Sequence, residues 1–260
     1  MNACRVSVIL PAYNAGAFLR PAALSVLNQE VEGLEAIVID DGSTDGSLDS
    51  LDGLSVRVVR RENGGEASAR NAGVRAAQGR YVTFLDSDDL LAPGGLAPRL
   101  DFLDRNPDAW AVGGLPRALI DERGERIAEV FERMAARLSF PFRLTLESYR
   151  KGGFFPVVCP LYLYRREVFD RLGFYDEDPR IVTDCDFHFR LLEKTSIPVL
   201  REPIYDRRLH GANLSLVGSR AAALEFRPDV LRSIREVNRR HGMEPAEIVP
   251  WENDYLGSGR

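Results

Sequence analysis

Three carboxylates follow one apolar stretch within four residues of sequence. Residues 81–85 read Tyr-Val-Thr-Phe-Leu, and Asp86, Ser87, Asp88 and Asp89 come directly after them. Such a stretch predicts a strand buried on both faces, so the acids stand where that strand reaches the surface. Three neighbouring acids repel one another unless a cation lies among them. Mg²⁺ or Mn²⁺ is commonly held by one or two carboxylates together with substrate phosphates, so this loop predicts a metal ion bound to a diphosphate.

A second acidic loop follows a strand-like stretch earlier in the chain. Residues 34–39 read Leu-Glu-Ala-Ile-Val-Ile, and Asp40, Asp41, Gly42 and Ser43 come directly after them. In an open α/β sheet, ligands bind beyond the carboxyl ends of the strands, and parallel strands end at the same edge. The two acidic loops therefore predict one ligand site along one edge of a sheet.

The elements that must position these loops alternate regularly. Strands are predicted at residues 5–10 (stopping at Pro11), 34–39, 56–59 and 81–85, and helices at 18–29, 47–51, 66–77 and 96–103. Such alternation is typical of an α/β fold with a mostly parallel, Rossmann-like central sheet and helices on both faces. This fold would bring the acids of separate loops to the same edge.

The rest of the chain has a less regular pattern. Extended segments are predicted at residues 110–113, 157–164, 197–200 and 205–209, helices at 166–172, 184–194 and 221–241, and a loose tail at 251–260. Residues 114–156 mix short apolar pieces with Arg and Glu, and their pattern assigns no elements.

Composition and charge narrow the classes of protein to consider. The chain has 260 residues and a hydrophobic fraction of 45%, which suits one large α/β domain. A net charge of −5 argues against nucleic acid as a partner, because phosphate backbones require basic surfaces. Three scattered cysteines argue against a disulfide framework or a zinc site. No apolar run is long enough for a membrane span, so we expect a cytoplasmic protein with at most peripheral contact to the inner membrane face.

Six segments of the chain resemble the inverting family 2 nucleotide-sugar glycosyltransferases. They are residues 8–14 (VILPAYN), 38–45 (VIDDGSTD), 69–73 (ARNAG), 84–89 (FLDSDD), 183–191 (TDCDFHFRL) and 210–215 (HGANLS). The fourth resembles the D-x-D block of that family, and the fifth resembles its E-D-x-D-F-x-x-R-L block. The resemblance implies a GT-A type fold, with a nucleotide-sugar-binding half at residues 1–113. An acceptor-binding half with a C-terminal helical extension, residues 114–260, would continue it without a linker.

The resemblance also implies roles for particular residues, carried over position by position. Nucleotide-sugar binding is implied for Pro11, Ala12, Tyr13, Asp40, Asp41, Arg70, Asp86 and Ser87, and metal binding for Asp88 and His210. Asp41, alone or with Asp40, is expected to accept a hydrogen bond from the nucleobase. Asp86 is expected to reach the ribose, and Arg70 to approach the base or the diphosphate.

Asp184 is implied as the general base. Transfer from a nucleoside diphosphate sugar breaks the anomeric C–O bond, and a carboxylate across the sugar takes the proton of the attacking hydroxyl. Because the hydroxyl attacks the face opposite the diphosphate, the configuration inverts. Mn²⁺ or Mg²⁺ would stabilise the departing diphosphate. Metal and base must lie on opposite sides of the sugar, and Asp88 and Asp184 stand in separate regions of the chain, as this requires. One position departs from the family pattern, because Thr183 stands where a Glu usually precedes the base.

Simpler structural roles stay open for several of these residues. The acids of the first loop could cap a turn or a helix. Arg70 could form a surface ion pair with Glu66, four residues earlier on the same helix. Asp184 could cap its helix, with Asp186 as the competing base, and His210 could be a solvated loop histidine.

The function expected from these observations is metal-dependent, inverting hexosyl transfer. The donor would be a UDP-, GDP- or dTDP-sugar, and the acceptor a hydroxyl of a glycan or a lipid-linked glycan in surface polysaccharide synthesis. One alternative is a non-catalytic nucleotide-sugar-binding protein, which Thr183 favours. Another is a phosphatase of the haloacid dehalogenase type. That family requires Thr or Val where Leu90 stands and a later catalytic Lys, and the lysines are Lys151 and Lys194, in unconvincing contexts.

Overall fold

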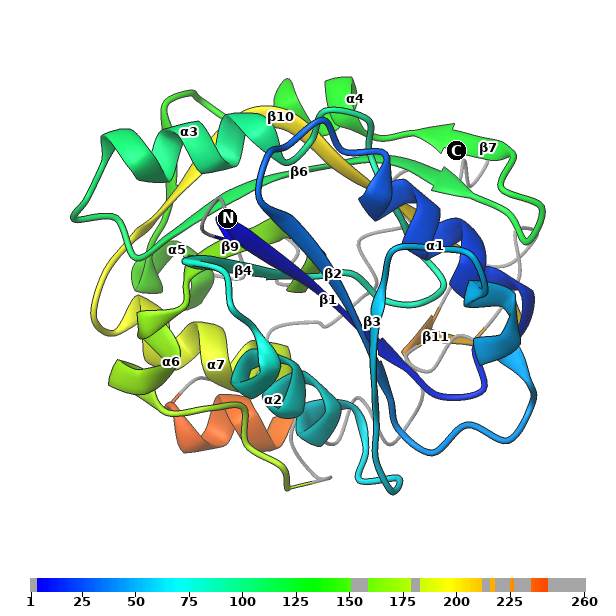
Figure 1. Ribbon diagram of the computed structural model, residues 1–260. Coiled ribbons are helices and arrows are strands. Elements are labelled where there is room, and N and C mark those ends of the chain that lie inside the picture. The colour runs from blue at the N-terminus through cyan, green and yellow to red at the C-terminus, as the bar shows by residue number, and fades with distance from the viewer. Residues whose placement is uncertain are drawn as a thin grey trace.

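A curled sheet runs through the molecule in the computed structural model (Figure 1). The structure describes residues 4–150, 159–178, 183–211, 216–217, 225–226 and 235–242. The strands of this sheet are β1 (Val6–Ala12), β2 (Leu34–Asp40), β3 (Arg57–Arg60), β4 (Tyr81–Phe84), β5 (Leu90–Leu91), β6 (Ala111–Ile120), β7 (Arg126–Glu129), β8 (Phe142–Leu144), β9 (Tyr162–Arg165) and β10 (Ile197–Arg208). The α-helices are α1 (Leu19–Leu27), α2 (Glu66–Ala76), α3 (Ala97–Arg105), α4 (Phe131–Ala135), α5 (Leu146–Arg150), α6 (Glu167–Leu172) and α7 (Thr183–Leu192). Short 3₁₀ helices are η1 (Gly16–Phe18), η2 (Ser47–Leu51) and η3 (Cys159–Leu161).

The sheet is mostly parallel, as predicted. Its order is β3-β2-β1-β4-β9-β6-β10-β5, with β7 beside β6 and β8 beside β10. Strands β3, β2, β1 and β4 are mutually parallel. Strand β9 is antiparallel to both β4 and β6, and β10 is parallel to β6, so β6 and β10 point the same way as β1. The carboxyl ends of β1, β2, β4 and β10 therefore share one edge, on the right of Figure 1. This edge carries both acidic loops, as the sequence predicted.

The prediction that the first strand stops at Pro11 is wrong, because β1 continues to Ala12. On the β4 side, the last bond runs from Leu85 N to Ile9 O (3.0 Å), while Ala12 O accepts from the β2 side. The backbone N–H and C=O groups of successive residues in a strand point alternately to its two neighbouring strands. The missing N–H of Pro11 therefore faces the β4 side beyond the last bond there, and the proline costs no ladder hydrogen bond.

Helices cover both faces of the sheet. In Figure 1, α1, α3 and α4 lie above the sheet, and α2, α6 and α7 lie below it. Helix α2 lies very close to β1, because a Cβ placed on Gly73 would be 2.3 Å from Ile9 Cγ2. Helices α6 and α7 are joined by stacked rings, with the centroids of Phe169 and Phe187 4.8 Å apart. The ring of Phe84 of β4 meets Phe169 edge-on at 6.2 Å, so this aromatic cluster fixes α7 against the sheet.

Two predicted elements are wrong in type. In the predicted strand at 157–164, Cys159–Leu161 forms η3, which contains Pro160, and the strand β9 starts only at Tyr162; residues 157–158 lie outside the described residues. The predicted helix at 221–241 is not continuous, because Glu225–Phe226 forms strand β12, antiparallel to β11 (Leu216–Val217). A proline at position 228 would remove a hydrogen bond from the interior of such a helix. Residues 235–240 are helical, and the predicted tail at 251–260 lies outside the described residues.

Other differences concern the later part of the sheet. The two extended segments predicted at 197–200 and 205–209 are one strand, β10, whose pairing with β6 shifts register between Val199 and Asp206. Residues 114–150, to which the pattern assigned no elements, hold the end of β6, then β7, α4, β8 and α5. Strand β6 crosses the predicted division at residue 113, so the two predicted halves share a strand. Within the described ranges, no helix combines the length and apolarity that crossing a membrane requires.

Candidate active site

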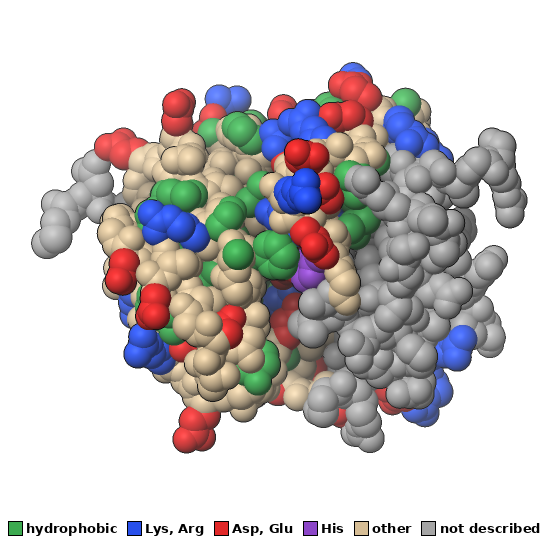
Figure 2. All heavy atoms as spheres, turned by 90° about the vertical axis from the view of Figure 1, so that its right-hand side faces the viewer, with side chains coloured by type: hydrophobic (Ala, Val, Ile, Leu, Met, Phe, Trp, Pro, Cys, Tyr) green, Lys and Arg blue, Asp and Glu red, His purple; other side chains and the backbone are tan. Residues whose placement is uncertain are grey.

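The acidic loop after β4 brings three carboxylates together. Asp86, Asp88 and Asp89 each offer one oxygen, and these oxygens all lie within 4.8 Å of one another. Figure 2 looks onto this edge of the molecule, where a histidine and acidic side chains gather near the middle of the face. Carboxylate oxygens are the ligands that Mg²⁺ and Mn²⁺ prefer, so the donor set fits a hard divalent cation.

The three acids of this loop have different surroundings. Asp89 is fully buried, and its carboxylate accepts a hydrogen bond from the backbone N–H of Arg208 (2.7 Å). Burial raises the pKa of Asp89 well above its ordinary value. The side chains of Asp86 and Asp88 are instead 23% and 26% exposed. Asp89 therefore joins the loop to β10, while Asp86 and Asp88 are the acids a ligand can reach.

Asp88 is paired with His210. Its Oδ2 lies 2.9 Å from His210 Nε2, and the His210 ring packs against Phe18 with centroids 4.8 Å apart. Burial alone would raise the pKa of Asp88. The hydrogen bond to His210 and the positive charge of Arg207 outweigh it, so the pKa lies below its ordinary value. The structure thus brings together the two residues predicted to bind metal, by a direct contact between them.

The second acidic loop is closely bonded to its neighbours. Asp40 Oδ1 accepts the N–H of Ser43 (2.8 Å). Asp41 accepts the N–H groups of Gly64 (3.0 Å) and Gly65 (2.8 Å), and its Oδ1 lies 3.0 Å from Arg61 Nε. Because Gly65 caps α2, Asp41 fastens the start of that helix to the end of β2. The predicted contacts of Asp40 and Asp41 with a nucleobase stay predictions.

The loop after β1 is attached to the same region. Asn14, with φ of 49°, accepts a hydrogen bond from Thr44 N–H (2.8 Å), and its own N–H donates to Ser43 Oγ (3.0 Å). Ala12 is buried, whereas Tyr13 is 54% exposed at the rim of the edge. Pro11, near the end of β1, and Ser87, in the loop after β4, are also predicted to contact the donor, and both are partly buried.

Arg70 links the donor loop to the predicted base. Its side chain, on α2, is 2% exposed. Nη1 lies 2.5 Å from Asp184 Oδ1, and Nη2 lies 3.2 Å from Asp86 Oδ1 and 2.6 Å from Glu66 Oε1. The guanidinium also lies over the Tyr175 ring, 5.8 Å from its centroid. The predicted ion pair with Glu66 therefore exists, but Arg70 is buried and contacts three acidic side chains, so it is not a surface residue.

The structure separates Asp184 from its competitor Asp186. Asp184 faces Arg70, whose Nη1 also donates to Thr183 Oγ1 at 3.3 Å. Asp186, two residues later on α7, pairs with Arg190 (2.8 Å) and lies 3.4 Å from His241 Nε2. Of the two acids, Asp184 is the one that shares a partner with the acidic loop after β4.

Two residues of this cluster were not assigned by sequence reasoning. Arg207 Nη1 lies 3.6 Å from Asp86 Oδ2 and 3.5 Å from Asp89 Oδ2. The sequence feature that could have pointed to Arg207 is its position within a predicted extended segment, three residues before His210. Glu66, half exposed at the start of α2, adds a further carboxylate. Attraction to Arg70 lowers the pKa of Glu66, but reduced hydration and repulsion from the neighbouring aspartates outweigh it and raise the pKa.

The site as a whole contains more acidic than basic side chains, which is one cause of the raised pKa of Glu66 and Asp89. Its acids are Glu66, Asp86, Asp88, Asp89 and Asp184, and the guanidiniums among them are Arg70, Arg207 and Arg208. Excess negative charge in a partly buried cluster is unfavourable. A divalent cation at the reachable acids would relieve it.

His188, on α7, contacts Tyr164 of β9 and makes stability depend on pH. The ring is fully buried, with Nε2 2.8 Å from the Tyr164 hydroxyl and Nδ1 2.7 Å from the Asp184 carbonyl oxygen. Burial lowers its pKa from 6.5 to about 4. The native state therefore holds a neutral ring, while the unfolded chain takes up a proton below its own pKa. Its contribution to stability is complete above pH 6.5 and is lost as the pH falls towards 4.

We therefore expect acid sensitivity that His188→Gln lacks. Between about pH 7 and about pH 5, the free energy of unfolding should fall by about 2 kcal/mol more in the unaltered protein than in the variant. Urea unfolding of both proteins at the two pH values measures this difference, and other titrating groups cancel in it. An equal fall in both proteins would contradict the assignment.

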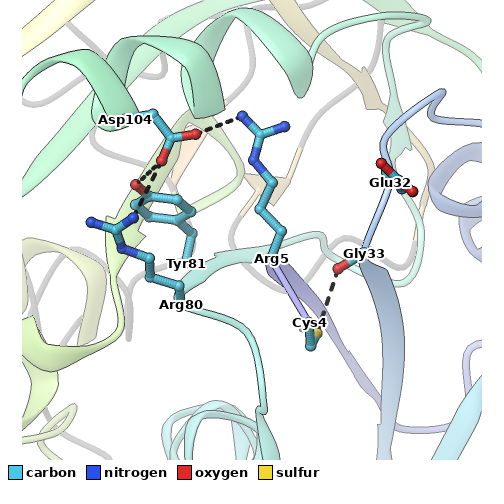
Figure 3. A pocket seen from close by; sticks show the side chains of 7 residues that line it. All are labelled: Cys4, Arg5, Glu32, Gly33, Arg80, Tyr81 and Asp104. Atoms are coloured by element: carbon cyan, nitrogen blue, oxygen red, sulfur yellow. Dashed lines mark hydrogen bonds and ion pairs between the residues drawn. The ribbon is translucent and has the colours of Figure 1, made fainter. Parts of the chain in front are cut away.

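A pocket of about 460 Å³ lies at the opposite edge of the sheet, where β1 and β4 begin. Figure 3 shows Arg5, Arg80 and Tyr81 converging on Asp104 there, with Cys4 farther away, next to Gly33. Arg5 lies 2.7 Å from Asp104, and the Tyr81 hydroxyl donates to the same carboxylate (2.6 Å). Arg5 and Arg80 are both paired with Asp104, and the pocket lies away from the acidic loops.

Comparison with known proteins agrees with this geometry. Residues 7–173 match the model of the family described as Glycosyl transferase family 2. An uncharacterized glycosyltransferase of Haemophilus influenzae is 43% identical over 133 residues, covering 49% of this chain and 52% of the relative. The uncharacterized glycosyltransferase EpsJ of Bacillus subtilis is 29% identical over 207 residues, covering 77% of this chain and 60% of the relative. The chain thus spans little more than half the length of these relatives.

Among solved structures, S. aureus TarS 1-349 in complex with UDP-GlcNAc matches with a TM-score of 0.67. The match covers 94% of this chain and 68% of TarS 1-349 at 21% sequence identity. At this identity the likeness concerns the fold.

Proposed function

Because the chain belongs to glycosyltransferase family 2 and has the GT-A type fold, we propose that it transfers a sugar from a nucleoside diphosphate sugar to an acceptor hydroxyl. The proposed reaction depends on a divalent metal and inverts the anomeric configuration. Membership of this family sets aside the phosphatase alternative.

The observation that carries the proposal is the guanidinium of Arg70, which contacts Asp86 and Asp184 at once. Residues far apart in the sequence thereby stand on two sides of one small region at the carboxyl edge. A donor held at the acidic loop would present its sugar towards α7. This is the separation of donor anchor and base that displacement from the opposite face requires.

The reachable acids fit a resident Mn²⁺ or Mg²⁺. Asp88, with Asp86 beside it, would hold the ion, and His210 would either orient Asp88 or become a ligand itself. When bound, such an ion supplies positive charge that stabilises the diphosphate as it leaves. Arg207, between Asp86 and Asp89, would add a fixed positive charge from the protein.

The proton and electron balance is simple. The oxygen of the acceptor hydroxyl forms a bond to the anomeric carbon, and its proton passes to the carboxylate of Asp184. The bond between that carbon and the diphosphate oxygen breaks, and its electron pair stays on the diphosphate. Thr183, in place of an acid, leaves Asp184 as the carboxylate nearest Arg70 on α7.

For the donor we propose a uridine diphosphate sugar first, because the TarS structure that matches is a complex with UDP-GlcNAc. GDP- and dTDP-sugars are the other candidates. The acceptor we propose is a glycan or lipid-linked glycan of surface polysaccharide, assembled on the cytoplasmic side with at most peripheral membrane contact. The family resemblance supports this setting.

The direct test is calorimetry with UDP, GDP and dTDP, each with MnCl₂ or with EDTA. We expect one nucleotide to bind at least about tenfold more tightly with manganese. A screen of the matching donor sugars for nucleotide release then tests transfer. Binding without any release or transfer would favour the non-catalytic alternative, and no metal-dependent binding of any nucleotide would contradict the proposal.

A further inference from the structure

One buried cation joins two parts of the site that come from different elements. Arg70 extends from α2 and contacts Glu66 on its own helix, Asp86 of the acidic loop, and Asp184 on α7. Its side chain is 2% exposed, so it is withdrawn from solvent. A buried guanidinium needs hydrogen-bond acceptors for its N–H groups, and those of Arg70 contact carboxylates, so its position and theirs depend on one another.

The helix that carries Arg70 is itself held in place on several sides. Asp41 accepts both N–H groups that lead into it, from Gly64 and Gly65. Asn71, the next residue, exchanges two hydrogen bonds with the backbone of Tyr175, at 2.9 and 3.0 Å. The guanidinium therefore projects from a rigid base, between the end of β2 and the segment that leads to α7.

The carboxylate of Asp184 has its shorter contact with a side chain from another helix, not from its own. Its Oδ1 lies 2.5 Å from Arg70 Nη1, and the hydroxyl of neighbouring Thr183 is 3.4 Å away from the same oxygen. The shorter contact comes from another helix and carries charge, so it is the stronger orienting force. Through Nη2, the same guanidinium is tied to Asp86 at 3.2 Å.

We propose that Arg70 is a positioning residue, which orients the carboxylate of Asp184 and fixes its distance from the donor loop through Asp86. The inference rests on the proposed function, because Asp184 is the base of that reaction. The planar fork of arginine is needed, since two nitrogens must reach two acids in fixed directions. A lysine would keep the charge but offer one nitrogen in place of two.

The test is Arg70→Lys, measured by steady-state kinetics and calorimetry. We expect kcat to fall about tenfold or more, the donor KM to stay within about threefold, and metal-dependent nucleotide binding to be retained. Retained binding also shows that the variant folds. The matched control is Arg75→Lys on the same helix, where the arginine lies over the Phe174 ring at 4.4 Å, and it should leave kcat unchanged.

A double-mutant cycle separates positioning from a merely structural role. Arg70→Lys should lower transfer strongly in the unaltered protein, but by less than about twofold in the Asp184→Asn background, followed over long incubations. An equal fall in both backgrounds, or a loss confined to nucleotide binding, would overturn the proposal. If Arg70→Lys does not fold, a variant that combines Arg70→Gln with Glu66→Gln replaces it in the same cycle. This variant removes one acidic side chain together with the cation. Should Asp184→Asn itself transfer normally, the proposed base is wrong, which is a different result from a normal Arg70→Lys.

Discussion

Replacing Asp184 by asparagine should remove sugar transfer and leave nucleotide binding in place. The amide has the same shape as the carboxylate, and its oxygen can still accept the hydrogen bond from Arg70 Nη1 at 2.5 Å. It cannot take up a proton from the acceptor hydroxyl. General bases contribute about a hundred- to ten-thousand-fold to rate, so kcat should fall by about that factor.

The measurement compares transfer at saturating donor with nucleotide binding by calorimetry. Asp186→Asn is the matched control, because that acid is on the same helix and pairs with Arg190 instead of Arg70. The control should lower the free energy of unfolding, since Asp186 is buried, while kcat stays within about threefold. Normal transfer by Asp184→Asn would show that another group accepts the proton.

Replacing Asp88 by asparagine should abolish the effect of metal on nucleotide binding. Asp88 is one of the two acids of its loop that a ligand can reach, and the amide removes the negative charge that attracts a divalent cation. We expect nucleotide affinity with manganese to fall by about tenfold or more, to the level seen with EDTA. Transfer should fall with it.

Calorimetry of each protein with manganese and with EDTA measures this change. Asp89→Asn is the informative comparison, since Asp89 is fully buried and bonded to the N–H of Arg208 at 2.7 Å. The Asp89→Asn variant should have a lower free energy of unfolding. The fraction that stays folded should keep most of the metal dependence of nucleotide binding. An Asp88→Asn protein whose nucleotide affinity still rises with manganese would place the ion elsewhere.

Together, these two variants divide the site by function. Asp88→Asn should lose metal-dependent binding and therefore transfer, whereas Asp184→Asn should lose transfer alone. Such a result would assign the acidic loop after β4 to the donor and α7 to the proton. Arg70, which contacts both sides, would then be the residue through which the two depend on each other.

Local patterns in the sequence predicted the first half of the fold well. Runs such as residues 81–84 are apolar and β-branched because both faces of the strand are buried, and this leaves a readable signal. The shared edge of the acidic loops followed from the parallel alternation alone. The same reasoning failed for residues 221–241, where an amphipathic spacing outweighed the proline at position 228, and for 157–164, where Pro160 lies in a 3₁₀ turn.

By itself, then, the sequence determined which residue types were available and at which edge they would gather. The family resemblance singled out Asp86 and Asp88 by position, but residue type gave no physical reason why Asp89 should differ from them, because all three acids have the same chemistry. Tertiary packing decided this by burying Asp89 against β10 and by setting Arg70 between Asp86 and Asp184. The physical reason is that hydration and charge at a side chain depend on neighbours more than a hundred residues away, and no local pattern encodes those distances.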